Sequence, residues 1–189
     1  HGPALSAALP RFRPERQGRG EGLCYRRCSA RHGIDAASCR FCCSFRRQSL
    51  WETPLFDRET KEHLEKKFPL ASFRPAGENS FTPDLSGGYR TDEPDEEAAC
   101  PFLDSEKGCV LSDEEKPFDC KIWPLRAVRK SAGGKIFVAL TTTCPAVNRL
   151  PFSEVQSLVK SGLGGKILSY ASANPDIVKD WRGGFVEVE

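Results

Sequence analysis

Six cysteines fall in two short stretches whose spacing suits a metal site. The first stretch, SCRFCCS, contains Cys39, Cys42 and Cys43, and the second, CPFLDSEKGCVLSDEEKPFDCKIWP, contains Cys100, Cys109 and Cys120. A C-x2-C spacing lets the chain turn back so that two thiolates grip one ion, as in zinc and iron–sulfur sites. The second stretch is rich in proline and charged residues, so it can bury little apolar surface. We therefore expect a metal bound through sulfur to hold it in place.

Three further cysteines lie outside these stretches. Cys144 follows a predicted β-hairpin, in which PLRAVRK and KIFVALTTT flank the turn SAGG, and this hairpin would return Cys144 toward the second stretch. Cys24 and Cys28 have a C-x3-C spacing that places both thiols on one face of a helix. They either extend the metal site or form a separate pair. The predicted metal ligands are Cys39, Cys42, Cys43, Cys100, Cys109, Cys120 and Cys144.

The cysteine count favours metal ligation over disulfides. The chain has nine cysteines, an odd number, so complete pairing would leave one thiol over. The first residues lack the charged, apolar and small-residue order of a signal peptide, so we expect a cytoplasmic, reducing environment in which disulfides are rare. Disulfides and unconnected buried thiols are the alternatives.

The overall charge gives no support for a nucleic-acid or membrane partner. The 189 residues include 28 Lys and Arg against 26 Asp and Glu, a net charge of +2. No apolar run approaches the about 20 residues that span a bilayer. Arginines are concentrated in residues 1–22, and an acidic run occupies residues 92–97. We predict no membrane and no nucleic acid as partners, a flexible Arg-rich arm over 1–22, and one metal-binding domain over 23–189.

The elements between the two cysteine stretches are a helix and an irregular connection. An amphipathic helix is predicted within WETPLFDRETKEHLEKKF, with Asp57 as its cap and Leu64 on its apolar face. His63 is read as a surface residue of this helix rather than a ligand. Residues 70–99 are rich in proline and glycine, which predicts an irregular segment leading into the second cysteine stretch.

The C-terminal region predicts two helices and a short strand. A capping box that begins at Ser153 starts the first helix, with Val155, Leu158 and Val159 facing inward. A second helix is predicted at about 166–173, and GGFVEVE predicts the strand. The fold class is therefore α+β: a small single domain with several helices, one β-hairpin and a large irregular region pinned by a cysteine-bound metal site.

With these motifs in view, the chain resembles the YkgJ-type CxxCxxCC family of zinc- or iron-chelating proteins. The resemblance rests on SCRFCCS, CPFLDSEKGC, KPFDC, KIWP and CPAV, and it covers residues 39–150. The first cysteine of the family pattern would fall at position 36, which is Ala, and Lys116 stands where the family usually has Arg. The resemblance implies a cysteine-bound metal centre. It also implies a relation to flagellin lysine N-methylases, which share the cysteine cluster.

The metal is either an iron–sulfur cluster, most simply 4Fe–4S, or zinc, because both suit thiolate ligands. Proline follows Cys100 and Cys144, as it follows the last cysteine of ferredoxin runs, which favours the cluster. Three functions follow from these options. The first is a metal-cluster protein with a redox, cluster-carrying or sensing role. The second is a metal-dependent enzyme such as a protein lysine methyltransferase. The third is a zinc-stapled module that binds a protein partner through the acidic run or the Arg-rich arm.

Overall fold

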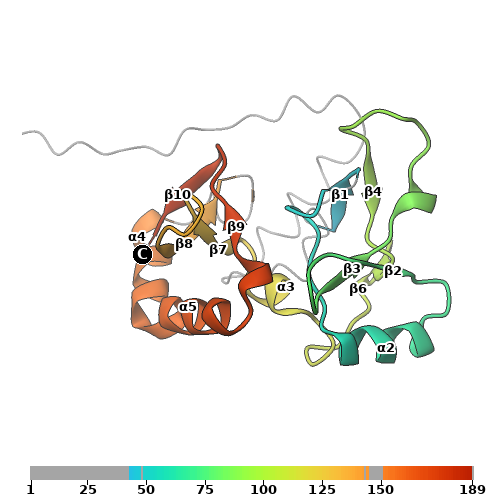
Figure 1. The fold of residues 1–189 in the computed structure, drawn as a ribbon, viewed down its shortest axis with the longest axis horizontal. Helices are drawn as coiled ribbons and strands as arrows, with labels where there is room; N and C mark the ends of the chain where they lie inside the picture. Colours follow the sequence, from blue (N-terminus) through green and yellow to red (C-terminus); the bar gives the residue numbers. More distant parts are fainter. Residues whose placement is uncertain (1–42, 48, 143, 145–150, 189) are drawn as a thin grey trace, which may run out of the picture.

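The computed structural model describes residues 43–47, 49–142, 144 and 151–188, and these residues form two lobes joined by a short helix (Figure 1). The N-terminal lobe holds β1 (Ser44–Arg46), α2 (Arg58–Lys67), β2 (Phe73–Pro75), β3 (Phe81–Pro83), the 3-10 turn η2 (Ser86–Gly88), β4 (Glu97–Ala99), β5 (Leu103–Asp104) and β6 (Gly108–Cys109). The joining helix is α3 (Phe118–Ile122). The C-terminal lobe holds β7 (Leu125–Arg129), β8 (Ile136–Thr141), α4 (Phe152–Leu158), the π-helical turn η4 (Val159–Leu163), α5 (Gly164–Ala173), η5 (Pro175–Ile177), β9 (Lys179–Asp180) and β10 (Phe185–Glu187).

Helix α2 forms where its capping signal predicts. The Asp57 carboxylate accepts a hydrogen bond from the Thr60 amide at 2.8 Å, which satisfies one of the free N–H groups of the first turn. Leu64 is completely buried on the inner face, while charged side chains occupy the outer faces. The predicted helix, its cap and its buried residue are therefore confirmed.

The N-terminal lobe is built from short two-stranded ribbons around an aromatic core. Strand β1 pairs antiparallel with β4, β2 with β3, and β5 with β6. The core centres on Phe102, whose ring lies 5.4 Å from that of Phe68 and 5.9 Å from that of Phe56. Burying a side chain of this size contributes about 1.5–3 kcal/mol. This packing against Leu64 holds α2 against ribbons too short to be stable alone.

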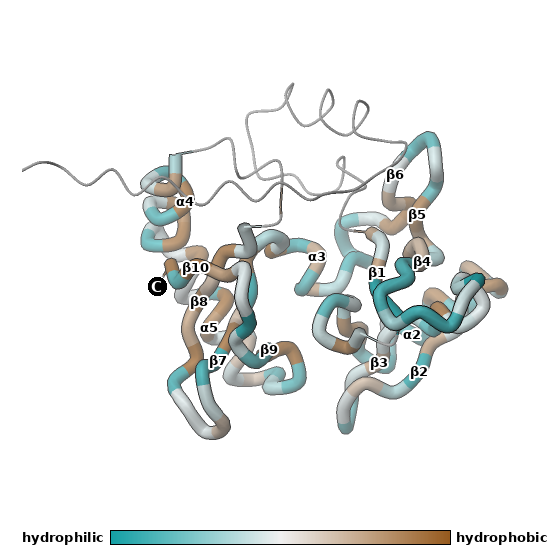
Figure 2. The backbone as a smooth tube through the Cα atoms, turned by 90° about the horizontal axis from the view of Figure 1, so that it is seen from above, coloured by the Kyte–Doolittle hydropathy of each residue, from teal (hydrophilic) through white to brown (hydrophobic). Residues whose placement is uncertain are grey.

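The C-terminal lobe is a four-stranded sheet with the order β10-β8-β7-β9. Strands β7 and β8 form the predicted hairpin, and Ala127 pairs with Val138. Side chains alternate between two apolar clusters: Val138 packs with α4 and α5, whereas Phe137 packs on the opposite face with Phe185. Both faces of the hairpin are therefore buried, and the tube of β8 is largely apolar in Figure 2.

Helices α4 and α5 differ in detail from the prediction. Helix α4 begins after Pro151 with no side-chain cap, so the predicted capping box at Ser153 is wrong. Val155 and Val159 are buried as predicted, but Leu158 is 43% exposed. Gly162 has a φ of 123°, which glycine adopts without strain, and here the two helices join through the π-helical turn instead of ending.

One strap of chain, residues 49–57, connects the two lobes. The Trp51 indole donates to the Asp180 carbonyl at 3.0 Å, and the buried Lys179 ammonium donates to the Leu50 carbonyl at 2.9 Å. Leu55 packs into the main core of the C-terminal lobe. In Figures 1 and 2 the lobes lie side by side with α3 between them. The strap and α3 therefore fix how the lobes meet.

The α+β class is confirmed, as are the β7–β8 hairpin and the short strand at β10. The prediction of a single hairpin is wrong, because two further short antiparallel pairs, β2–β3 and β5–β6, join adjacent segments. Residues 70–99 are likewise less irregular than predicted, since they contain β2, β3 and β4. The predicted arm over 1–22 lies outside the described residues. No helix in the described part of the chain is long and apolar enough to cross a membrane.

Candidate metal centre

The β1–β4 ribbon brings Cys43 opposite Cys100. Ser44 pairs with Ala99, and the Cys100 amide donates to the Cys43 carbonyl at 2.7 Å, which extends the ladder by one pair. The two cysteines are far apart in sequence but neighbours across two strands. The first predicted cysteine stretch therefore meets the second at this point.

The β5–β6 turn brings Cys109 back beside Cys100. Asp104 starts the turn by accepting hydrogen bonds from the Glu106 and Lys107 amides at 2.8 and 2.7 Å. Gly108 has a φ of 87°, which favours glycine, and closes it. Cys109 then pairs with Leu103, whose amide donates to the Cys100 carbonyl at 3.0 Å. Cys100 and Cys109 both pack against the aromatic core of the N-terminal lobe.

Helix α3 presents Cys120 to the same group. Pro117 starts the helix, and its carbonyl accepts from the Cys120 amide at 3.0 Å. The rings of Phe118 and Tyr170 stack with centroids 3.8 Å apart, which holds α3 against α5. The charges of Cys100 and Cys43 act on Cys120, so its thiol lies within electrostatic reach of theirs.

Burial and mutual charge make these thiols hard to ionise. Burial, together with the charges of Cys43 and Cys109, raises the pKa of Cys100 to about 12. Burial and the charge of Cys43 also raise the pKa of Cys109. Desolvation around its sulfur and the charges of Cys100 and Asp119 raise the pKa of Cys120, whose residue as a whole is exposed. A bound cation would relieve this repulsion between thiolates.

A buried ion pair lies directly beside Cys120. Asp119 and Arg126 are each 3% exposed, and the Arg126 guanidinium donates to the Asp119 carboxylate at 2.7 Å. The other carboxylate oxygen accepts from the Leu55 amide at 3.2 Å, and Arg126 also donates to the Glu52 carbonyl at 3.1 Å. The pair thus ties α3, β7 and the strap together.

Sequence reasoning missed Asp119 and Arg126. The sequence does contain a signal for both residues. Asp119 lies between Phe118 and Cys120, and Arg126 lies inside the apolar strand β7. A buried charge within an apolar run requires a partner. The hairpin prediction uses that strand only for its apolar residues and its turn.

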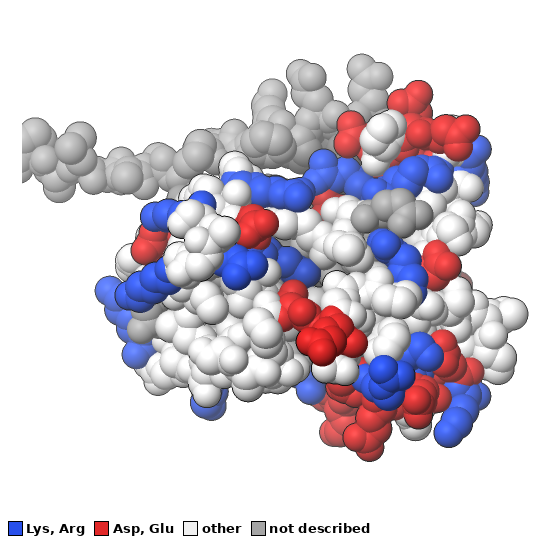
Figure 3. Space-filling view, in the orientation of Figure 1, with Lys and Arg blue, Asp and Glu red and all other residues white. Residues whose placement is uncertain are grey.

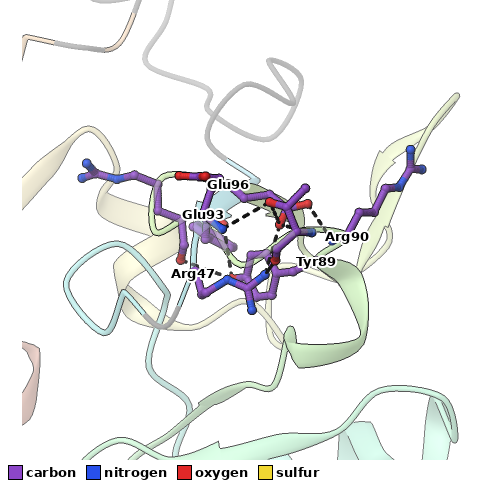
Figure 4. A network of polar contacts seen from close by, with 8 residues as sticks. Arg47, Tyr89, Arg90, Glu93 and Glu96 are labelled. Carbon is purple, nitrogen blue, oxygen red and sulfur yellow. Dashed lines mark hydrogen bonds and ion pairs between the residues drawn. The ribbon is translucent and has the colours of Figure 1, made fainter.

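The polar network of Figure 4 fixes the loop that leads into β4. Glu96 accepts hydrogen bonds from the Arg90 and Thr91 amides at 2.6 and 2.8 Å and from Arg47 at 3.1 Å. The Arg47 guanidinium lies 4.4 Å from the centre of the Tyr89 ring. These contacts close the acidic run into a loop over β1, and β4 then carries the chain to Cys100.

A second polar contact fixes the loop between Cys109 and Cys120. Glu115 accepts from Lys67 at 2.6 Å and from the Ser112 amide at 2.9 Å, and its carboxylate lies 2.9 Å from the His63 ring. These contacts lower the pKa of Glu115 to about 2, with the Lys67 bond as the largest cause. His63 is thus a surface partner of Glu115, in line with its reading as a helix-surface residue.

Of the remaining predicted ligands, the structure describes Cys144 alone. Cys144 is buried in the core of the C-terminal lobe with Leu140 and Val155. Cys39 and Cys42 lie outside the described residues, as do Cys24 and Cys28. Within the described ranges, no three His, Cys, Asp or Glu side chains form a group that could hold a metal ion. The soft donors fit a thiophilic metal in their chemistry, but the described residues alone do not complete a ligand set.

Charge on the visible surface is mixed rather than segregated by sign over α2 (Figure 3), whose sequence RETKEHLEKK contains both acidic and basic residues.

Comparison of the chain with protein-family models, with curated proteins and with solved structures gave no match.

Proposed function

We propose that the protein holds a cysteine-ligated metal centre, an iron–sulfur cluster in preference to zinc, and serves a redox, cluster-carrying or sensing role. The supporting observation is that Cys43, Cys100, Cys109 and Cys120 come from two ribbons and one helix, yet the charge of Cys43 acts on the pKa of each of the other three. Burial of unrelated thiols does not require these three elements to meet at their cysteines.

The proposed ligands are drawn from this group and from the sequence motif. Cys43, Cys100, Cys109 and Cys120 would supply thiolates from the N-terminal lobe and α3, and Cys39 and Cys42 are further candidates from the sequence motif. The shared spacing also supports membership of the YkgJ-type family. A bound cluster supplies one-electron chemistry, whereas zinc supplies a structural crosslink.

The chain's own residues would position the sulfurs and limit their exposure to water. The aromatic core packs against Cys100 and Cys109, and the Asp119–Arg126 pair fixes α3, on which Cys120 lies. The charge of Arg126 favours the thiolate of Cys120, while that of Asp119 opposes it. The methyltransferase alternative rests on the resemblance alone.

Elemental analysis of anaerobically purified protein tests the proposal. We expect iron with acid-labile sulfide and a brown colour. Stoichiometric zinc in a colourless protein would favour the zinc-stapled module over the iron–sulfur protein. Protein free of both metals would overturn the proposal.

The substitution Cys120→Ser identifies a ligand. We expect loss of most of the bound metal and a lower melting temperature, because metal binding and folding are coupled in such loops. Val110→Ser is the matched control, since it introduces the same side chain at a position that is 37% exposed in the same stretch, and it should retain the metal. Equal metal contents in the two variants would remove Cys120 from the ligand set.

A further inference from the structure

The β1–β4 ribbon places two cysteines directly opposite each other, close to the arrangement that a disulfide requires. The ladder pairs Ser44 with Ala99, and the hydrogen bond from the Cys100 amide to the Cys43 carbonyl sets these two cysteines directly opposite each other. Opposed residues of a hydrogen-bonded antiparallel pair have Cα atoms about 5.5 Å apart. This separation lies within the range of about 4.4–6.8 Å that disulfides span.

Both side chains leave the same face of the ribbon. Residues two apart in a strand share a face, so Cys43 lies with Phe45 and Cys100 with Ala98. The contacts agree, because Cys100 packs in one apolar cluster with Phe45 and Ala98. Opposed Cβ atoms typically lie about 4.5–5.5 Å apart, so bond formation requires a small approach of the strands. Over the residues that the structure describes, the ribbon consists of β1 and β4 alone.

Both cysteines are partly accessible, which lets a small reagent reach the pair. Neither cysteine is part of a disulfide among the described residues. The sheet register, rather than their reactivity, distinguishes them from Cys109, which pairs with Leu103 on another ribbon.

We propose that Cys43 and Cys100 form a reversible cross-strand disulfide by exchange with a small-molecule disulfide such as glutathione disulfide. The Cys43 sulfur attacks one sulfur of the reagent, its S–S bond breaks, and one small thiol leaves with the proton from Cys43. The Cys100 sulfur then attacks the Cys43 sulfur of the mixed disulfide and releases the second small thiol with the proton from Cys100. Two protein thiols lose two electrons in total, and the reagent gains them as two thiols.

Cys43 is the first nucleophile because Cys100 lies between two apolar clusters, which restrict access to its sulfur. The step needs no metal, so the inference stands apart from the proposed metal centre. A ligating metal would compete with it for the same sulfurs.

The experiment titrates the full chain, as isolated and after treatment with a chelator, with glutathione and glutathione disulfide at graded ratios. Free thiols are then alkylated and the protein is digested with trypsin. The sequence predicts that Cys43 is in the peptide 41–46 and that Cys100 is the sole cysteine of the peptide 91–107. The first peptide also contains Cys42. Mass-spectrometric fragment ions from cleavage between Cys42 and Cys43 therefore show which of these two cysteines forms the link.

We expect the Cys43–Cys100 link to be enriched about tenfold or more over a chain unfolded in guanidinium, because the fold raises the effective concentration of one sulfur at the other. Cys43→Ser and Cys100→Ser should each abolish it. Cys109→Ser, which alters a nearby thiol that is not opposite Cys43, should preserve it.

Two results would overturn the inference: a link no more frequent in either native preparation than in the unfolded chain, or a dominant link from Cys100 to a different cysteine. The metal content, measured on the same samples, tests the proposed metal centre independently of the disulfide. A metal-bound protein without the link refutes only the disulfide, and a metal-free protein with the link refutes only the metal centre.

Discussion

Asp119 and Arg126 carry opposite charges into a region with almost no access to water. A paired buried charge is tolerated because its partner and its hydrogen bonds replace the lost solvent, but the same charge left alone is costly. The Asp119 carboxylate has two such partners, Arg126 and the Leu55 amide. A single residue here affects α3, and with it the position of Cys120.

Arg126→Met should therefore destabilise the protein by about 3–5 kcal/mol, because it leaves the Asp119 carboxylate buried and uncompensated. The double variant Asp119→Leu with Arg126→Met should recover much of this loss. Urea denaturation measures both. Lys130→Met is the control: it breaks the exposed ion pair with Glu187, which is worth about 0–1 kcal/mol. Equal losses for Arg126→Met and Lys130→Met would contradict the role of the buried pair.

At the scale of elements, the thiols are positioned by loops that polar contacts hold closed. Short strands such as β4 and β6 gain little from their own pairing. Glu96 fixes the loop before Cys100, and Glu115 fixes the loop after Cys109. Each carboxylate accepts several hydrogen bonds from backbone and side chains, which satisfies loop amides that no strand pairs.

Glu96→Ala should open the loop that leads into β4, because the Arg90 and Thr91 amides lose their acceptor. Amide hydrogen exchange should become faster at these two residues and in β4, while α5 keeps its protection. Asp92→Ala, at an exposed position of the same loop, is the matched control. The network of Figure 4 would have no such role if both variants exchanged alike.

Glu115 should make stability depend on acidic pH. Its pKa is lowered from an ordinary 4.5 to about 2, so the folded state favours the carboxylate. This contribution is complete above pH 4.5 and is lost as the pH falls toward about 2. The difference in melting temperature between the wild type and Glu115→Gln should therefore shrink over that range. A constant difference for Glu115→Gln across that range would refute the prediction.

Local signals explain which elements could be predicted from the sequence. Helix α2 has a cap and a helical pattern within its own residues, and the β7–β8 hairpin has a glycine turn between two apolar runs. The β1–β4 pairing has no such signal, since its three-residue strands lie some fifty positions apart. Periodicity cannot identify partners at that distance.

The candidate site, too, could be predicted from the sequence only in part. Cysteine spacing predicted Cys43, Cys100, Cys109 and Cys120 as site residues. In the fold, the charge of Cys43 raises the pKa of each of the other three. The spacing could not separate them from Cys144, because burial in the other lobe depends on how α4 and α5 pack. Asp119 was missed because its importance lies in its contact with Arg126, which arises only in the folded chain.

At the scale of the whole molecule, the lobes depend on a few polar contacts made by the strap. The Lys179 side chain is buried, with the residue only 7% exposed. Its ammonium donates a hydrogen bond to the Leu50 carbonyl. Its strand β9 runs parallel to β7, so this bond ties the edge of the C-terminal sheet to the strap.

Lys179 should make stability rise at alkaline pH. Burial lowers its pKa from 10.5 to about 8, so the unfolded chain binds the proton more tightly between these values. Stability gained by this group is therefore complete above pH 10.5 and lost as the pH falls through about 8. Urea denaturation should show that the free energy of unfolding of the wild type rises relative to that of Lys179→Met between pH 8 and pH 10. Parallel behaviour of the two proteins would contradict the burial of a titrating amine.

The order of strands across the C-terminal sheet has a consequence for biosynthesis. The hairpin β7–β8 leaves the ribosome before β9 and β10, which later cover its two edges. Until then both edges carry unpaired backbone groups and are open to association with other nascent chains. Residues 43–120, which include the N-terminal lobe and α3, emerge earlier still. The N-terminal lobe can thus assemble during translation, whereas the C-terminal lobe must await residues 179–187.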